Sequence, residues 1–229
     1  EIGSGLVGSE MCIRDRLVYW CKAPAYCDDL PQHYTRYSVA FYKEAPRVNY
    51  ATIKYCDIAN GTGVRTSLFV SGCRRHCPEC FNAVAWDFGY GLPFDKAVRN
   101  EILGSLAPDY IDGLSLLGGE PFEPENQRAL VPFLHEVRVL YPHKTIWCYT
   151  GNVYETELLQ PSHARCEVTD EMLSLIDVLV DGEFIPAQHD ISLRFRGSGN
   201  QRIIDLNATR AAGHTVLWQD DPLFADHKM

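Results

Sequence analysis

Residues 70–80 of the chain read VSGCRRHCPEC, which gives Cys73, Cys77 and Cys80 a C-x3-C-x2-C spacing. An apolar run over residues 66–70 comes just before them and predicts a buried strand. Three thiolates so close in sequence can bind three corners of a cubane iron–sulfur cluster, which is normally held by four cysteines. No fourth cysteine lies nearby, so this spacing would leave one iron open to a small molecule.

A structural zinc site is the alternative interpretation of the same three cysteines. His76 would be the nearest nitrogen ligand, but it adjoins Cys77, which is an awkward position for binding the same ion. Zinc ligands also usually come as two separated pairs. The spacing therefore favours an iron–sulfur cluster, with a non-enzymatic zinc-binding adaptor as the alternative from a different class.

The chain around this loop alternates apolar runs with amphipathic segments. Strands are predicted at 66–70, 111–117, 145–149, 176–180 and 215–218. Helical spacing of apolar residues predicts helices over 94–106, 124–141 and 171–175. Strands that alternate with helices indicate right-handed βαβ units, so we expect an α/β fold with a mainly parallel sheet. Functional loops should then follow the carboxyl ends of the strands.

Two glycine-containing motifs fall at such strand ends. Gly118-Gly119-Glu120 follows the strand at 111–117, and Asp181-Gly182 follows the strand at 176–180. Glycines allow a ligand to approach the backbone, and Glu120 could accept hydrogen bonds from an ammonium group. An ordinary strand-to-helix turn would also favour a glutamate at the helix start, and Asp-Gly is itself a common turn.

Composition sets the broad class of the protein. The 229 residues are 46% hydrophobic, carry a formal charge of −9 and include nine cysteines. This apolar content excludes a disordered chain, and no apolar run reaches the roughly 18 residues of a membrane span. The acidic balance argues against direct nucleic-acid binding by bulk charge. Clustered cysteines without a visible leader peptide indicate a reducing compartment, so we expect a cytoplasmic protein.

Residues 1–47 look foreign to the rest of the chain. Residues 11–15 read MCIRD, which resembles a reading frame of a transposon end used in sequencing libraries. We therefore interpret 1–16 as an adapter scar and 17–47 as a translated upstream region. The codons of residues 43–45 can spell a ribosome-binding site before a GTG start at Val48, which makes 48–229 the expected natural domain. A genuine irregular extension is the alternative.

The motifs identify a resemblance to the radical S-adenosylmethionine superfamily, and within it to anaerobic ribonucleoside-triphosphate reductase activating proteins. The stretches that resemble this family extend over nearly all of 48–229. They are 57–65 (DIANGTGVR), 68–73 (LFVSGC), 80–82 (CFN), 115–121 (SLLGGEP), 180–184 (VDGEF) and 194–201 (RFRGSGNQ). The resemblance implies a partial, open (βα) barrel with a mainly parallel sheet.

The resemblance also implies a cofactor site. Cys73, Cys77 and Cys80 would hold one 4Fe–4S cluster, and S-adenosyl-L-methionine would bind its fourth iron. The strip Gly118-Gly119-Glu120 would lie beside the amino group of that cofactor, and Asp181 would line the same cavity.

The two neighbours of the last cysteine would lie near the adenine or the sugar of the cofactor. Phe81 is a plausible stacking partner. Glu79 departs from the family, which has glycine or an aromatic residue there, so we expect backbone contacts from this position. No catalytic residue is expected beyond the cluster and the bound cofactor.

The implied activity is that of a glycyl-radical-enzyme activase. Reduced flavodoxin or ferredoxin would supply an electron to the cluster, and cleavage of S-adenosylmethionine would yield a 5′-deoxyadenosyl radical. That radical would take a hydrogen atom from a glycine of the anaerobic ribonucleotide reductase large subunit. The basic residues 74–76 would then face either an acidic electron donor or solvent. An activase of another glycyl-radical enzyme, such as pyruvate formate-lyase, is the alternative.

Overall fold

The structure is a computed structural model, and it describes residues 47–220 of the 229. The chain divides into two units between residues 44 and 45, and all described residues belong to the second unit. The interpretation of residues 1–47 as a foreign leader therefore falls almost wholly outside the described residues.

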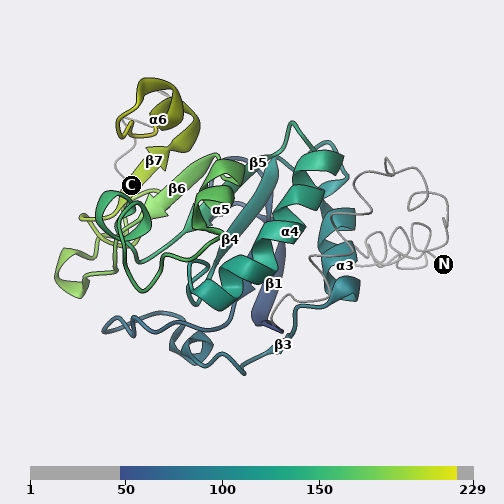
Figure 1. The fold of residues 1–229 in the computed structure, drawn as a ribbon, viewed down its shortest axis with the longest axis horizontal. Helices are drawn as coiled ribbons and strands as arrows, with labels where there is room; N and C mark the ends of the chain where they lie inside the picture. The colour runs from purple at the N-terminus through teal and green to yellow at the C-terminus, as the bar shows by residue number, and fades with distance from the viewer. Residues whose placement is uncertain (1–46, 221–229) are drawn as a thin grey trace, which may run out of the picture. The chain divides into compact units, whose positions relative to one another are not determined.

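Seven strands form one mixed sheet (Figure 1). The strands are β1 Asn49–Asp57, β2 Arg65–Val70, β3 Leu92–Pro93, β4 Gly113–Gly118, β5 Thr145–Tyr149, β6 Val178–Asp181 and β7 Arg202–Asp205. Their order across the sheet is β3-β1-β2-β4-β5-β6-β7. The central strands β2, β4, β5 and β6 are parallel, whereas β1 pairs antiparallel with β2 and β7 with β6. The α/β class and the mostly parallel sheet are confirmed, and the sheet is not closed.

Helices cover one face of this sheet. The helical segments are η2 Ala83–Trp86, α3 Lys96–Leu106, α4 Pro124–Leu140, η3 Tyr154–Leu158, α5 Thr169–Leu175, η4 Pro186–Gln188 and α6 Leu206–Ala212. Figure 1 shows α3, α4 and α5 on the same side of the strands. Side chains that alternate along β2 and β4, such as Leu68 and Leu116, meet these helices in the main core. No helix within residues 47–220 is long and apolar enough to cross a membrane.

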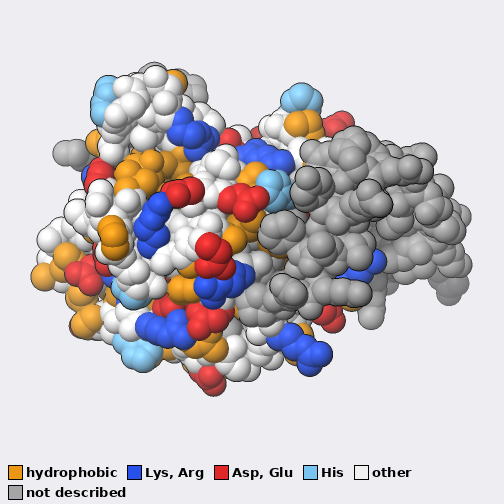
Figure 2. All heavy atoms as spheres, viewed as in Figure 1, with side chains coloured by type: hydrophobic (Ala, Val, Ile, Leu, Met, Phe, Trp, Pro, Cys, Tyr) orange, Lys and Arg blue, Asp and Glu red, His pale blue; other side chains and the backbone are white. Residues whose placement is uncertain are grey.

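The outward side of these helices is polar and mixed in charge. Figure 2 shows acidic and basic side chains interspersed on this face. Two side-chain contacts link α4 to α5 and to the residues just before it. Arg128 forms an ion pair with Glu167, and His135 Nε2 lies 2.7 Å from Glu171 Oε1 on α5. Such exposed pairs add little stability, so the buried apolar stripe is what holds α4 in place.

Arg65 is a buried charge at the amino end of β2. Its Nε donates to Ser115 Oγ (2.8 Å), and its Nη2 donates to the carbonyls of Leu114 (2.9 Å) and Thr145 (2.7 Å). Its Nη1 donates to the Thr62 carbonyl (3.1 Å) and to Thr145 Oγ1 (2.9 Å). This one side chain therefore ties β2, β4 and β5 together, at the ends opposite the cysteine loop.

The strand predicted at 215–218 is not one. Leu217 forms a single bridge with Ile204, and the Trp218 backbone N–H donates to the Ile203 carbonyl (2.9 Å). The segment follows α6, whose C-terminal cap is Gly213 in the left-handed region (φ 71°). Trp218 instead packs its ring 5.4 Å from that of Trp147, on the sheet face away from the main helices.

Candidate functional site

The cysteine loop follows β2 at its carboxyl end. Cys73 is buried, whereas Cys77 and Cys80 are partly exposed, and all three are free thiols. The Cys73 backbone N–H donates to the Trp86 carbonyl (3.1 Å), which ties the start of the loop to η2. His76 has a left-handed backbone (φ 51°), an unusual conformation that lets the loop turn back between the cysteines.

The donor set fits an iron–sulfur cluster better than a closed zinc site. Three thiols on one loop match the ligand class of such clusters. Within residues 47–220, no three His, Cys, Asp or Glu side chains are gathered closely enough to hold a metal ion. Burial raises the pKa of Cys73 to about 11 and also raises that of Cys77. Metal binding would therefore have to gather these thiols and displace their protons.

The glycine strip lies directly against the cysteine loop. A Cβ at Gly118, whose φ is 115°, would come within 2.5 Å of the Val70 carbonyl oxygen. A Cβ at Gly119 would come within 2.6 Å of the Gly72 carbonyl oxygen and 2.8 Å of that of Ala85. Both glycines are thus needed for this close approach, which brings together two motifs far apart in the sequence.

Glu120 joins the carboxyl end of β4 to the loop after β5. Its Oε1 accepts from the Phe122 backbone N–H and the Thr150 hydroxyl, and its Oε2 accepts from the Gly151 backbone N–H, each at 2.8 Å. The side chain is buried, and this burial raises its pKa to about 7, against the opposing effect of these donors and of Arg75. The oxygens are engaged by the protein itself, so contact with a ligand ammonium stays a prediction.

Glu120 should make stability fall as the pH rises. Below pH 4.5 the Glu120 carboxyl is protonated in both the folded and the unfolded chain. Between pH 4.5 and about 7 only the unfolded chain loses this proton, so rising pH favours unfolding. The wild-type free energy of unfolding should drop by about 3 kcal/mol over this window relative to Glu120→Gln. Urea unfolding of the cluster-free chain from pH 4.5 to 8 measures this. Parallel curves for the two proteins would contradict it.

The remaining expected cofactor residues lie in two different settings. Glu79 and Phe81 are on the surface of the cysteine loop, and the Phe81 side chain is 84% exposed. Asp181 is buried at the end of β6, where its Oδ2 accepts from the Tyr154 backbone N–H (2.9 Å) and the carboxylate pairs with Arg202. Of these three residues, Asp181 lines the cavity described next.

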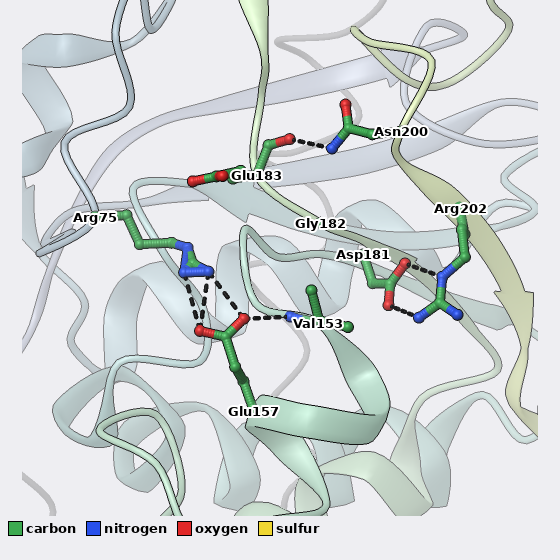
Figure 3. Close-up of a pocket in the computed structure, with 8 residues that line it drawn as sticks. All are labelled: Arg75, Val153, Glu157, Asp181, Gly182, Glu183, Asn200 and Arg202. Carbon is green, nitrogen blue, oxygen red and sulfur yellow. Dashed lines mark hydrogen bonds and ion pairs between the residues drawn. The ribbon is translucent and has the colours of Figure 1, made fainter.

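That cavity lies between the cysteine loop and the ends of β5 and β6 (Figure 3). Its volume is about 500 Å³, and it is lined by Arg75, Val153, Glu157, Asp181, Gly182, Glu183, Asn200 and Arg202. Figure 3 shows Arg75 with Glu157 on one side and Asp181 with Arg202 on the other. Sequence reasoning missed the contributions of Glu157 and Arg202 to this cavity. The motif at 194–201, which ends at the residue before Arg202, is the signal that could have pointed to it.

The basic charge of the cysteine loop is compensated within the protein. Arg74 pairs with Glu123 and Glu125, and Arg75 pairs with Glu157. The ring of His76 stacks on that of Trp86 at 4.5 Å. The loop therefore gives little support to an electrostatic contact with an acidic electron donor.

Comparison with known proteins yields one consistent result. A family model described as a 4Fe-4S single cluster domain matches residues 59–204. The anaerobic ribonucleoside-triphosphate reductase-activating protein of Haemophilus influenzae is 40% identical over 158 residues, which cover 68% of this chain and 97% of the relative. Its counterpart in Escherichia coli (strain K12) is 40% identical over 156 residues, 67% of this chain and 96% of the relative.

The relationship extends to a viral protein of the same name. The counterpart in Enterobacteria phage T4 is 35% identical over 156 residues, which cover 68% of this chain and 93% of the relative. Residues 59–204, which the family model matches, contain the cysteine loop, the glycine strip and the cavity. The chain therefore belongs to the family of anaerobic ribonucleoside-triphosphate reductase-activating proteins.

Proposed function

We propose that this chain is a radical S-adenosylmethionine activase that generates the glycyl radical of the anaerobic ribonucleotide reductase large subunit. The observation that carries the proposal is the three-cysteine loop packed against Gly118-Gly119, in a chain whose relatives are named for activating that reductase. Three cysteine ligands leave one cluster iron for a small molecule, as an open metal site requires.

The residues of the chain would divide the work of binding the cofactors. Cys73, Cys77 and Cys80 would hold one 4Fe–4S cluster, which with S-adenosyl-L-methionine supplies one-electron cleavage and hydrogen abstraction. The backbone of Gly118-Gly119 would receive the amino-acid end of S-adenosylmethionine, because both glycines are partly exposed at the carboxyl end of β4. Asp181 would line the part of the cavity that the same cofactor occupies.

The two exposed neighbours of Cys80 belong to the same proposal. Phe81 would stack on the adenine or the sugar of the cofactor, and Glu79 would contribute backbone contacts. Both residues are exposed on the cysteine loop, so a ligand could reach them. Ligand contact at these two positions would bury the Phe81 ring, which is otherwise an exposed large apolar surface.

The wider expectations follow from this activity. We place the activase domain at residues 48–229 and interpret the open sheet as a partial (βα) barrel whose mouth carries the cysteine loop. Reduced flavodoxin or ferredoxin would be the electron donor. The six cysteines of the described residues are all free, which supports a reducing cytoplasm.

The proposal is tested by mixing the anaerobically reconstituted chain with a reductant, S-adenosylmethionine and the candidate reductase large subunit. A glycyl radical signal in electron paramagnetic resonance, absent without S-adenosylmethionine, is the expected result. A glycyl radical signal that appears only with pyruvate formate-lyase would mean that this enzyme, and not the reductase, is the partner. Metal analysis should give about four irons per chain, and stoichiometric zinc without iron would refute the activase.

A further inference from the structure

We propose that Arg75 and Glu157 are positioning residues that hold the cysteine loop in place for its cluster. This inference rests on the proposed function, because it concerns the same three cysteines. Arg75 lies two residues after Cys73 and two residues before Cys77. Whatever fixes Arg75 therefore restricts the position of both thiols.

The contact between the two side chains is a two-pronged ion pair. Arg75 Nη2 donates to Glu157 Oε1 (3.0 Å) and Oε2 (2.9 Å), and Arg75 Nη1 donates to Oε1 (3.2 Å). The Arg75 side chain is only 14% exposed and that of Glu157 25%. Such a charge-assisted, bidentate pair defines direction as well as distance, unlike a contact through lysine.

Glu157 is itself held rigidly. Its Oε2 also accepts from the Val153 backbone N–H (2.7 Å), at the entry to the π-helical turn η3. The next residue, Tyr154, donates its backbone N–H to buried Asp181. Single π-turns of this kind are frequent at functional sites, and this one presents a fixed carboxylate to the cysteine loop.

The stem of Arg75 adds a second point of attachment. A Cβ at Gly151 would come within 2.6 Å of Arg75 Cδ and 2.7 Å of its Nε, so only glycine leaves room for the stem. The Gly151 backbone N–H donates to Glu120, which follows the glycine strip. Arg75 therefore connects the cysteine loop to both loops that surround the expected cofactor site.

The other arginine of the loop attaches it at a different place. The Arg74 backbone N–H donates to buried Glu123 (2.7 Å), and its half-exposed guanidinium pairs with Glu123 and Glu125 at the start of α4. This contact lies away from the cavity and does not involve the loop after β5. Arg75 is the one of the two whose pair is largely shielded from solvent and borders the cavity.

The test uses Arg75→Met, which keeps the apolar stem over Gly151 but removes the ion pair. Partners in the outer shell of a metal site typically change metal affinity by about 10- to 100-fold, and we expect a loss of iron affinity in that range. The electron paramagnetic resonance signal of the reduced cluster should also broaden, because the thiolates are less uniformly placed. Arg75→Lys should recover only part of the loss, since it restores charge without the bidentate geometry.

A double-mutant cycle shows whether the two residues act together. Glu157→Gln should lower the iron affinity about as much as Arg75→Met does. The double variant should bind iron no more weakly than whichever single variant has the lower affinity. Additive losses would mean that the residues act separately and would overturn the proposal. Arg128→Met is the matched control, because it breaks another Arg–Glu pair, far more exposed at 39% and 63%, and should leave iron affinity unchanged.

A measurement without the cluster keeps this inference separate from the proposed function. In the cluster-free chain, alkylation of buried Cys73 should be several-fold faster in Arg75→Met than in the wild type, because a loosened loop exposes this thiol, with Cys166 as the internal reference. Equal alkylation rates would overturn the positioning role even if the chain proves to be an activase. A chain that binds no iron would refute the activase, while the alkylation experiment would still report on Arg75.

Discussion

Cys77→Ser is expected to abolish both cluster binding and activation of the reductase. Serine is not ionised at neutral pH and is a poor ligand for iron, so only two thiolates would remain for the cluster. The loss should exceed the roughly 10- to 100-fold effect of disturbing an outer-shell partner. Anaerobic reconstitution followed by iron and sulfide analysis measures the first effect, and the glycyl radical signal measures the second.

Cys73→Ser and Cys80→Ser should behave in the same way, since each removes one of three ligands. Cys56→Ser is the matched control, because Cys56 is an exposed free thiol near the carboxyl end of β1. It should keep full iron content and full activity. A Cys77→Ser protein that retains four irons per chain would show that the cluster is held elsewhere.

Arg65→Met is expected to lower the free energy of unfolding by about 3–5 kcal/mol, because a hydrogen bond to a charged group contributes about 1.5–3 kcal/mol and this guanidinium makes five. The change leaves the buried Leu114 carbonyl, the Ser115 hydroxyl and the part-buried Thr145 carbonyl without the Arg65 donor. Burial lowers the pKa of Arg65 to about 10, so the side chain is still charged at neutral pH. Urea unfolding of the cluster-free chain at pH 7 measures the loss.

Arg65→Lys should recover a minor part of this stability, because one ammonium cannot reach the acceptors on β4, on β5 and at Thr62 at once. The exposed arginine in Arg128→Met again provides the control and should cost at most about 1 kcal/mol. A loss of less than about 1 kcal/mol for Arg65→Met would mean that water or neighbouring donors replace the guanidinium.

The central strands and main helices were predictable because their apolar patterns are local. The run at 66–70 became β2 and the run at 145–149 became β5, while the helix expected at 124–141 became α4. β2 and β5 bury consecutive residues and therefore read as short apolar runs, whereas α4 buries one stripe and therefore reads as helical spacing.

The outer, antiparallel strands escaped prediction for the complementary reason. β1, next to the edge strand β3, exposes several of its side chains, including Tyr55, and the edge strand β7 has only four residues. Such strands are stabilised mainly by backbone pairing with a neighbour, which leaves little trace in the order of side chains. The antiparallel strands on both sides of the sheet could therefore be identified only from the folded structure.

For the site, the sequence alone predicts which residues carry the chemistry. The spacing of Cys73, Cys77 and Cys80 and the glycines at 118 and 119 are local patterns, and ligand type follows directly from side-chain type. The tertiary structure decided what the charged residues do. The sequence predicts that Arg75 faces an acidic electron donor or solvent, whereas in the fold it pairs with Glu157, 82 residues away. The partner of a charge depends on the packing of distant elements, and no local pattern records that.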